Sequence, residues 1–159
     1  MKIIVDANIV FSGILNTKSK ISDLVVNSHL LIDFIAPEFL QTEIRKHYLK
    51  LSSLSKLPID QVIDSELQVC KDIIFISEEL VSIDNWNLAN ELVKDVDEKD
   101  APYIAFSKQF NCKIWSGDKK LVSGLKKRGF NNFISTDQLL EFREKLKADK
   151  SKRRRSRLP

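Results

Sequence analysis

Short apolar runs separated by helical patterns constrain the fold of this chain more than any other feature of its sequence. The runs cover residues 3–5, 31–35, 73–76, 113–116 and 133–134, and β-branched or aromatic residues dominate them. Runs with so few polar residues are typical of strands that are buried on both faces of a parallel sheet. Their alternation with helices predicts an α/β fold, a three-layer α/β/α sandwich with a mostly parallel central sheet of about five strands.

Apolar residues at helical spacing occupy the segments between these runs. They predict helices over residues 21–28, 38–53, 58–70, 88–94, 97–110, 121–128 and 138–147. The two consecutive helices between residues 38 and 70 are interpreted as an insert or cap. A turn is expected around Ser12 and Gly13, because glycine commonly interrupts regular structure.

Length and composition favour one ordinary domain. The chain has 159 residues, of which 43% are hydrophobic and 30% charged, with only 4 Gly and 4 Pro, as in a soluble globular protein rich in helix. The first apolar run stops at Asp6, too early for a signal peptide or a membrane span, so we expect a cytoplasmic protein that does not bind a membrane. Cys70 and Cys112 are interpreted as reduced packing residues, because they show no CxxC spacing.

A dense basic run ends the chain and separates a domain of residues 1–148 from a tail of residues 149–159. Such a run repels itself and is expected to be disordered in isolation. Two interpretations stay open, a solubilising tail and an arm that meets a phosphate backbone. The tail residues that would contact nucleic acid are Lys152, Arg153, Arg154, Arg155 and Arg157.

Carboxylates follow two of the predicted strands. In open α/β sheets ligands bind outside the carboxyl ends of the strands, and Asp6 and Asp118 lie directly after such ends. Glu43, about one turn into the next predicted helix, is placed to face the same edge. Asp97 and Asp100 open a further helix, where they are explained equally well as helix caps. Capping is also an alternative for Asp118.

Converging acids would need a cation. Two carboxylates about 4 Å apart repel by roughly 4 kcal/mol at an effective dielectric constant near 20. Hard oxygen ligands without nearby His or Cys favour Mg²⁺ or Mn²⁺, which can promote hydrolysis of a phosphodiester. His29 and His47 are expected to lie on helices far from the acids.

Four features, in this order along the chain, resemble the motifs of the PIN-domain family. Residues 6–12 resemble its opening motif, in which an Asp is followed two residues later by Asn or Ser. Glu43 stands where the family has a helical acid. Residues 97–105 resemble the motif whose second Asp enters an apolar helix, and residues 116–121 resemble the final motif, with Ser116 where Thr is more usual.

The resemblance implies a Mg²⁺- or Mn²⁺-dependent ribonuclease that cleaves single-stranded RNA. Its acids would be Asp6, Glu43, Asp100 and Asp118, of which Asp6, Asp100 and Asp118 would bind the metal. Asn8 and Ser116 would be supporting polar groups, and Asp97 an outer or additional ligand. Many relatives are toxins restrained by a small antitoxin protein and are commonly homodimers, so the resemblance implies both partners.

Two other functions compete with this interpretation. A non-catalytic RNA-binding or regulatory protein with the same fold would tolerate the loss of Asp6, whereas a nuclease would not. A phosphotransferase or phosphatase would use Asp6 as a nucleophile, but such sites generally need a second carboxylate two residues later, where this chain has Asn8.

Overall fold

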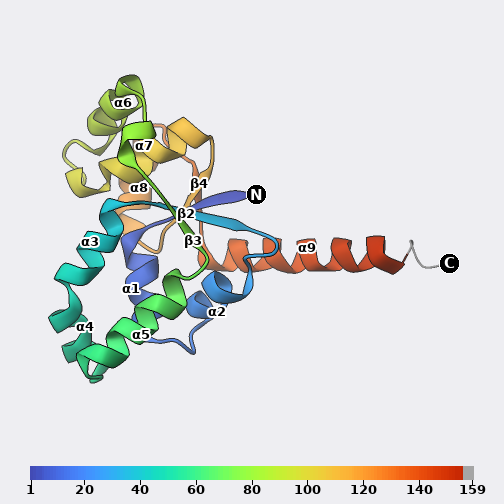
Figure 1. Ribbon diagram of the computed structural model, residues 1–159. Helices are drawn as coiled ribbons and strands as arrows, with labels where there is room; N and C mark the ends of the chain where they lie inside the picture. The colour runs from blue at the N-terminus through green and yellow to red at the C-terminus, as the bar shows by residue number, and fades with distance from the viewer. Residues whose placement is uncertain (156–159) are drawn as a thin grey trace.

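The computed structural model describes the backbone of residues 1–155 and the side chains of residues 1–152. Its centre is a five-stranded parallel sheet in the order β3-β2-β1-β4-β5 (Figure 1). The strands are β1 (Lys2–Val5), β2 (Asp33–Pro37), β3 (Ile73–Ile76), β4 (Lys113–Trp115) and β5 (Phe133–Ile134). From β1 the chain first adds β2 and β3 on one side of the sheet, and then adds β4 and β5 on the other side. The direction of strand addition therefore reverses between β1 and β4. Open α/β sheets bind ligands at such a reversal.

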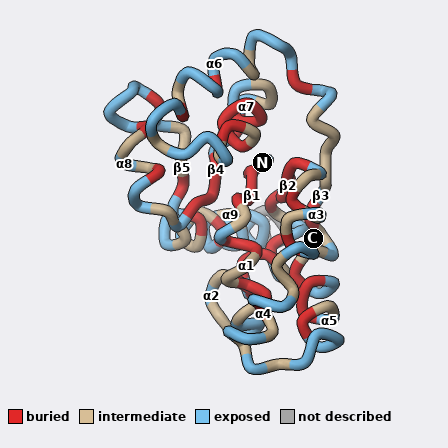
Figure 2. Tube along the Cα trace, turned by 90° about the vertical axis from the view of Figure 1, so that its left-hand side faces the viewer, coloured by how far each residue is buried: buried red, intermediate tan, exposed pale blue. Residues whose placement is uncertain are grey.

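Helices cover both faces of the sheet and bury two apolar cores. The helices of the described residues are α1 (Ala7–Leu15), α2 (Lys20–Asn27), α3 (Phe39–Lys46), α4 (Tyr48–Ser55), α5 (Ile59–Cys70), α6 (Ile83–Val93), α7 (Ala101–Phe110), α8 (Lys119–Lys127) and α9 (Thr136–Arg155), with short 3₁₀ helices at Glu78–Leu80 and Glu98–Asp100. Residues of α1, α2, α5 and α9 share one core, and residues of α6, α7 and α8 share the other. Figure 2 shows the buried positions in the strands and in the helices beside them. The predicted α/β/α sandwich is therefore confirmed.

Three local predictions differ from the structure. Ser12 and Gly13 lie inside α1 and form no turn. Gly13 is needed for close packing instead, since a Cβ there would lie 3.2 Å from Cγ1 of Val69 on α5. The second strand begins at Asp33, two residues later than predicted, and the helix predicted over residues 38–53 is interrupted at His47.

The last helix is longer than predicted. It continues through residues 149–155, where a disordered tail was expected, because lysine and arginine, which dominate this stretch, are strong helix formers. Arg143 fastens its first half to α2 through an ion pair of 2.7 Å with Asp23, and its second half extends away from the body (Figure 1). The side chains of residues 153–155 and all of residues 156–159, which include Arg157, lie outside the described residues.

Two further observations complete the fold. Cys70 and Cys112 are free, and burial raises the pKa of their thiols to about 12 and about 11, as suits packing residues. Within residues 1–155 no helix is both long and apolar enough to cross a membrane.

Candidate active site

Asp6 is the most deeply placed acid of the site. It follows β1, is 2% exposed, and caps the N-terminus of α1 by accepting a hydrogen bond of 3.0 Å from the Ile9 amide to Oδ1. Burial raises the pKa of this carboxyl to about 6, although the Ser116 hydroxyl and the backbone amides of Ile9 and Asn8 favour its charged form. The negative charge of Asp118 adds to the increase. A charge in this position is costly unless something pairs with it.

Asp118 reaches the same place from the neighbouring strand. The pairing of Val5 with Trp115 sets Asp6 beside Ser116 at the carboxyl edge of β1 and β4. Asp118 follows two residues later and caps α8, because its Oδ1 accepts hydrogen bonds of 2.8 Å from the Lys120 amide and 2.9 Å from the Leu121 amide. The capping alternative is therefore correct for Asp118, yet its charge still acts on Asp6.

The Ser116 hydroxyl shapes this turn. It accepts a hydrogen bond of 3.1 Å from the Asp118 amide, and Ser116 is buried, with 6% of its surface exposed. One side chain thus links the two acids, since it also lowers the pKa of Asp6. Asn8 is exposed one turn away and lines a small cavity together with Asp118.

Asp100 joins the pair from the start of α7. Burial raises its pKa to about 7, and the charges of Asp97, Asp6 and Asp118 raise it further in that order of effect. Its side chain makes no capping hydrogen bond at the start of α7, whereas Asp97 caps the preceding 3₁₀ helix through a bond of 3.0 Å from the Lys99 amide. The two acids, which helix capping alone explained equally well in the sequence, therefore differ, and Asp97 acts as a cap.

Glu43 lies on α3 with a partly exposed side chain, and its carboxylate is paired with a lysine. Its Oε1 accepts a hydrogen bond of 2.9 Å from Nζ of Lys46, which is the main reason why its pKa is lowered. The expectation that both histidines lie far from the acids is wrong for His47, because Nδ1 of His47 is 2.8 Å from the Glu43 carbonyl oxygen. His29 lies beside Asp72 instead, at 3.5 Å.

Sequence reasoning missed Tyr103, which lies one turn after Asp100 on α7. Its buried hydroxyl has no hydrogen bond of good geometry to any described residue. Burial, followed by the charges of Asp6 and Asp100, raises the pKa of this phenol well above its usual range. A tyrosine three residues after an acid, on the apolar face of a helix, was the available signal, but it also fits an ordinary core residue.

The oxygen atoms of this cluster are suitable ligands for a hard divalent cation. Several carboxylates, one buried serine and one unpartnered phenol meet here, and all offer oxygen. In the part of the chain that the structure describes, no three His, Cys, Asp or Glu side chains are already arranged to hold one metal ion. The capping bonds of Asp118 use only Oδ1, which leaves Oδ2 for a ligand role.

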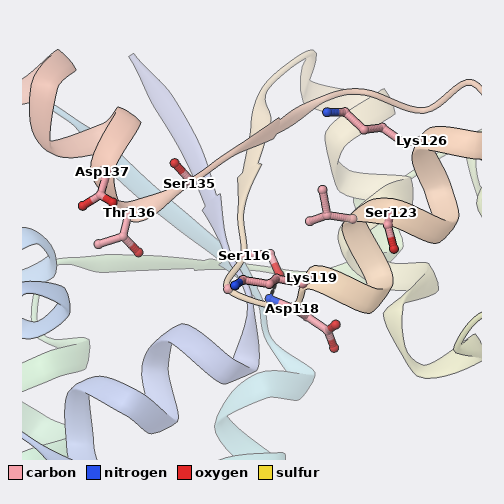
Figure 3. Close-up of a pocket in the computed structure, with 10 residues that line it drawn as sticks. Ser116, Asp118, Lys119, Ser123, Lys126, Ser135, Thr136 and Asp137 are labelled. Atoms are coloured by element: carbon pink, nitrogen blue, oxygen red, sulfur yellow. Dashed lines mark hydrogen bonds between the residues drawn. The ribbon is translucent and has the colours of Figure 1, made fainter.

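A cavity opens next to the acids. Ser116, Gly117 and Asp118 form one end of it, α8 forms a wall, and the start of α9 forms the opposite wall (Figure 3). The register of β4 with β5 pairs Trp115 with Ile134, so Ser135 continues the row of Asp6 and Ser116 along the sheet edge. Of Asp6, Asp100 and Asp118, only Asp118 lines this cavity, so the groove begins at Asp118.

Comparison with known families decides the relationship. The model of the PIN domain matches residues 4–149. The chain belongs to the PIN-domain family. PIN domains are generally nucleases that use divalent metal ions. The resemblance seen in the sequence motifs is thereby confirmed.

A solved structure supports the fold of this PIN domain. The crystal structure of VapBC2 from Rickettsia felis bound to a DNA fragment from their promoter contains a chain that superposes with a TM-score of 0.55. The match covers 85% of this chain and 97% of that chain at 13% sequence identity, a level at which the fold alone is shared. Among curated protein sequences none matches significantly.

Proposed function

We propose that this PIN domain is a ribonuclease that hydrolyses phosphodiester bonds in single-stranded RNA with Mg²⁺ or Mn²⁺. The observation that carries the proposal is that Asp6 and Asp118 follow neighbouring strands where the strand order reverses, close enough to Asp100 for their charges to raise its pKa. Burial and the repulsion between these carboxylates raise the pKa values of Asp6 and Asp100 to about 6 and about 7, so a nearby positive charge would favour their charged forms. A divalent cation would supply that charge. RNA as the substrate follows from the family resemblance.

The residues divide the chemistry between them. Asp6, Asp100 and Asp118 would hold the cation, which supplies Lewis acidity and activates water. Ser116 keeps Asp6 and Asp118 oriented, and Asn8 adds a polar group at the opening. Glu43 would orient the attacking water or a second ion after its carboxylate leaves Lys46.

The test is a cleavage assay with labelled structured RNA, unstructured RNA and single-stranded DNA in Mn²⁺, Mg²⁺ or EDTA. Asp6→Asn should lower cleavage by orders of magnitude. Asp33→Asn is the matched control, because Asp33 begins β2 at the opposite edge of the sheet and is exposed. Cleavage in EDTA, or equal cleavage by Asp6→Asn, would refute the nuclease. RNA binding without cleavage would instead support a non-catalytic regulatory protein.

We further infer that the protein is a cytoplasmic toxin restrained by a small antitoxin, and that it forms a homodimer. The support is the VapBC2 complex among the structures that share the fold, together with the family resemblance. Induced expression of the chain should arrest growth in a bacterial host, and Asp6→Asn should abolish the arrest. Growth arrest by both proteins would contradict a toxin that acts by cleavage.

A further inference from the structure

One face of α8 forms the wall of the cavity next to the acids. Lys119, Val122, Ser123 and Lys126 are spaced at three, four and seven residues and all line it. Residues with this spacing share one side of a helix. The cavity has a volume of about 440 Å³, and Figure 3 shows Lys119 at its acidic end and Lys126 at its far end. Two lysines therefore face a single space.

These two lysines are available to a ligand. Among the ion pairs of the described residues, none involves Lys119 or Lys126. Seven residues of helix separate them by about 10 Å along its axis. They can therefore reach an elongated anion from two points.

The opposite wall supplies hydrogen-bond donors. Oγ1 of Thr136 accepts a hydrogen bond of 3.0 Å from Nε1 of Trp115, and Oγ of Ser135 accepts one of 3.2 Å from the Gln138 amide. A hydroxyl that already accepts a hydrogen bond keeps its own hydrogen to donate. Both walls thus favour a ligand that accepts hydrogen bonds and carries negative charge.

One acid lines the far side of the cavity, and its charge is partly compensated. Asp137 accepts a hydrogen bond of 3.1 Å from Nζ of Lys20 on α2, and both side chains are largely exposed. Solvent screens an exposed carboxylate more than a buried one.

We propose that this cavity, which we name the α8 subsite, binds the phosphate of a nucleotide next to the scissile bond. The α8 subsite consists of Lys119, Ser123, Lys126, Ser135 and Thr136. Because it opens beside Asp118, an RNA strand that occupies it places its neighbouring phosphodiester at the acids. The inference rests on the proposed function for the identity of the strand as RNA, and it adds where that strand runs.

The experiment measures binding of a labelled single-stranded oligoribonucleotide in EDTA, which prevents metal-dependent cleavage. Lys126→Gln and Lys119→Gln should each raise Kd by about two- to fivefold and lower the slope of log K against log salt by about 0.7. Lys127→Gln is the matched control. Lys127 is the neighbour of Lys126 but does not line the cavity, so the variant removes the same charge outside the subsite. Asp137→Asn should change affinity in the opposite direction.

A second arm locates the phosphate. Oligonucleotides with one neutral methylphosphonate at successive positions should show one position that weakens binding to the unsubstituted protein but not to Lys126→Gln. Equal losses of affinity for Lys126→Gln and Lys127→Gln, no such position, or no binding to the unsubstituted protein would each overturn the α8 subsite. Inorganic phosphate or DNA that displaces the labelled RNA at the same concentration as unlabelled RNA would show that the subsite does not select RNA. This result would overturn the assignment of the bound strand as RNA.

The binding test of the α8 subsite can fail or succeed independently of the cleavage test of the proposed nuclease. Binding in EDTA does not depend on cleavage, so a selective loss of affinity in Lys126→Gln supports the α8 subsite even if no metal restores activity. Conversely, cleavage that Asp6→Asn abolishes, with unchanged binding by Lys126→Gln, would support the nuclease and refute the subsite.

Discussion

Replacing Asp6 by asparagine should stabilise the metal-free protein while it abolishes cleavage. The pKa of this carboxyl rises from 3.8 to about 6 on folding, because burial disfavours its charge. A difference of this size corresponds to about 3 kcal/mol of lost stability at pH values above 7. Asparagine removes the charge, and its oxygen can still accept the capping hydrogen bond from the Ile9 amide. The free energy of unfolding should therefore increase.

The pH dependence gives the sign of the effect. A carboxyl whose pKa is raised in the folded state takes up protons on folding, so it lowers stability as pH rises from about 4 to about 6. Below pH 4 both states are protonated and the penalty disappears. The advantage of Asp6→Asn should thus be about 3 kcal/mol at pH 8 and roughly half of that at pH 5.

Urea unfolding of both proteins at pH 5 and pH 8, in EDTA, measures this difference. Asp33→Asn serves as the control, since it removes an exposed acid at the opposite edge of the sheet. Added Mg²⁺ should then stabilise the unsubstituted protein but not Asp6→Asn, because a ligand stabilises only the state that binds it. A variant that is less stable by the same amount at both pH values would refute the reasoning, as it would show that packing rather than charge governs this position.

Three further predictions concern other parts of the molecule. Gly13→Ala should lower the free energy of unfolding by about 1 kcal/mol in urea titration, because overpacking against Val69 at 3.2 Å outweighs the gain in helix propensity, and Val69→Ala in the same chain should relieve it. Glu78→Ala should cost about 1 kcal/mol and reduce kcat, since Oε1 of Glu78 accepts a hydrogen bond of 2.7 Å from the Phe39 amide at the start of the helix that carries Glu43; Glu79→Ala should change neither. Deletion of residues 149–159 should flatten the salt dependence of RNA affinity by about 0.7 for each phosphate that the tail neutralises, and an unchanged slope would contradict a nucleic-acid arm.

The sequence was informative where local patterns decide the structure. Asp6 and Asp118 were found because Asp6 directly follows an apolar strand and Asp118 follows another after a short turn, and in a parallel sheet all carboxyl ends share one edge. Strand order was not predictable, because pairing in a parallel sheet depends on helix crossovers that leave no periodic signal. The exact position of β2 was missed because Leu31 and Ile32 are as apolar as the strand itself.

The remaining site residues depend on orientation, which one sequence does not reveal. Glu43 was predicted to face the acids from its helical position, but the sequence did not show that its carboxylate pairs with Lys46, one turn later. Tyr103 was overlooked because a tyrosine within an apolar helix is usually part of the core. The extension of α9 past Lys147 was missed because a basic run repels itself in isolation, whereas here it continues a helix that Arg143 already anchors.

Capping and metal binding, which seemed to be alternatives for these acids, are compatible in this fold. Asp6 and Asp118 cap α1 and α8, so the positive ends of two helices face the cluster and favour its negative charge. The two helix ends stabilise the negative charge of the neighbouring carboxylates without a cation. The raised pKa of Asp6 shows, however, that this stabilisation does not fully compensate for burial. Asp100 has no capping bond and a pKa of about 7, so its charge lacks this support. We therefore expect the proposed cation to change the ionisation of Asp100 more than that of the other two acids.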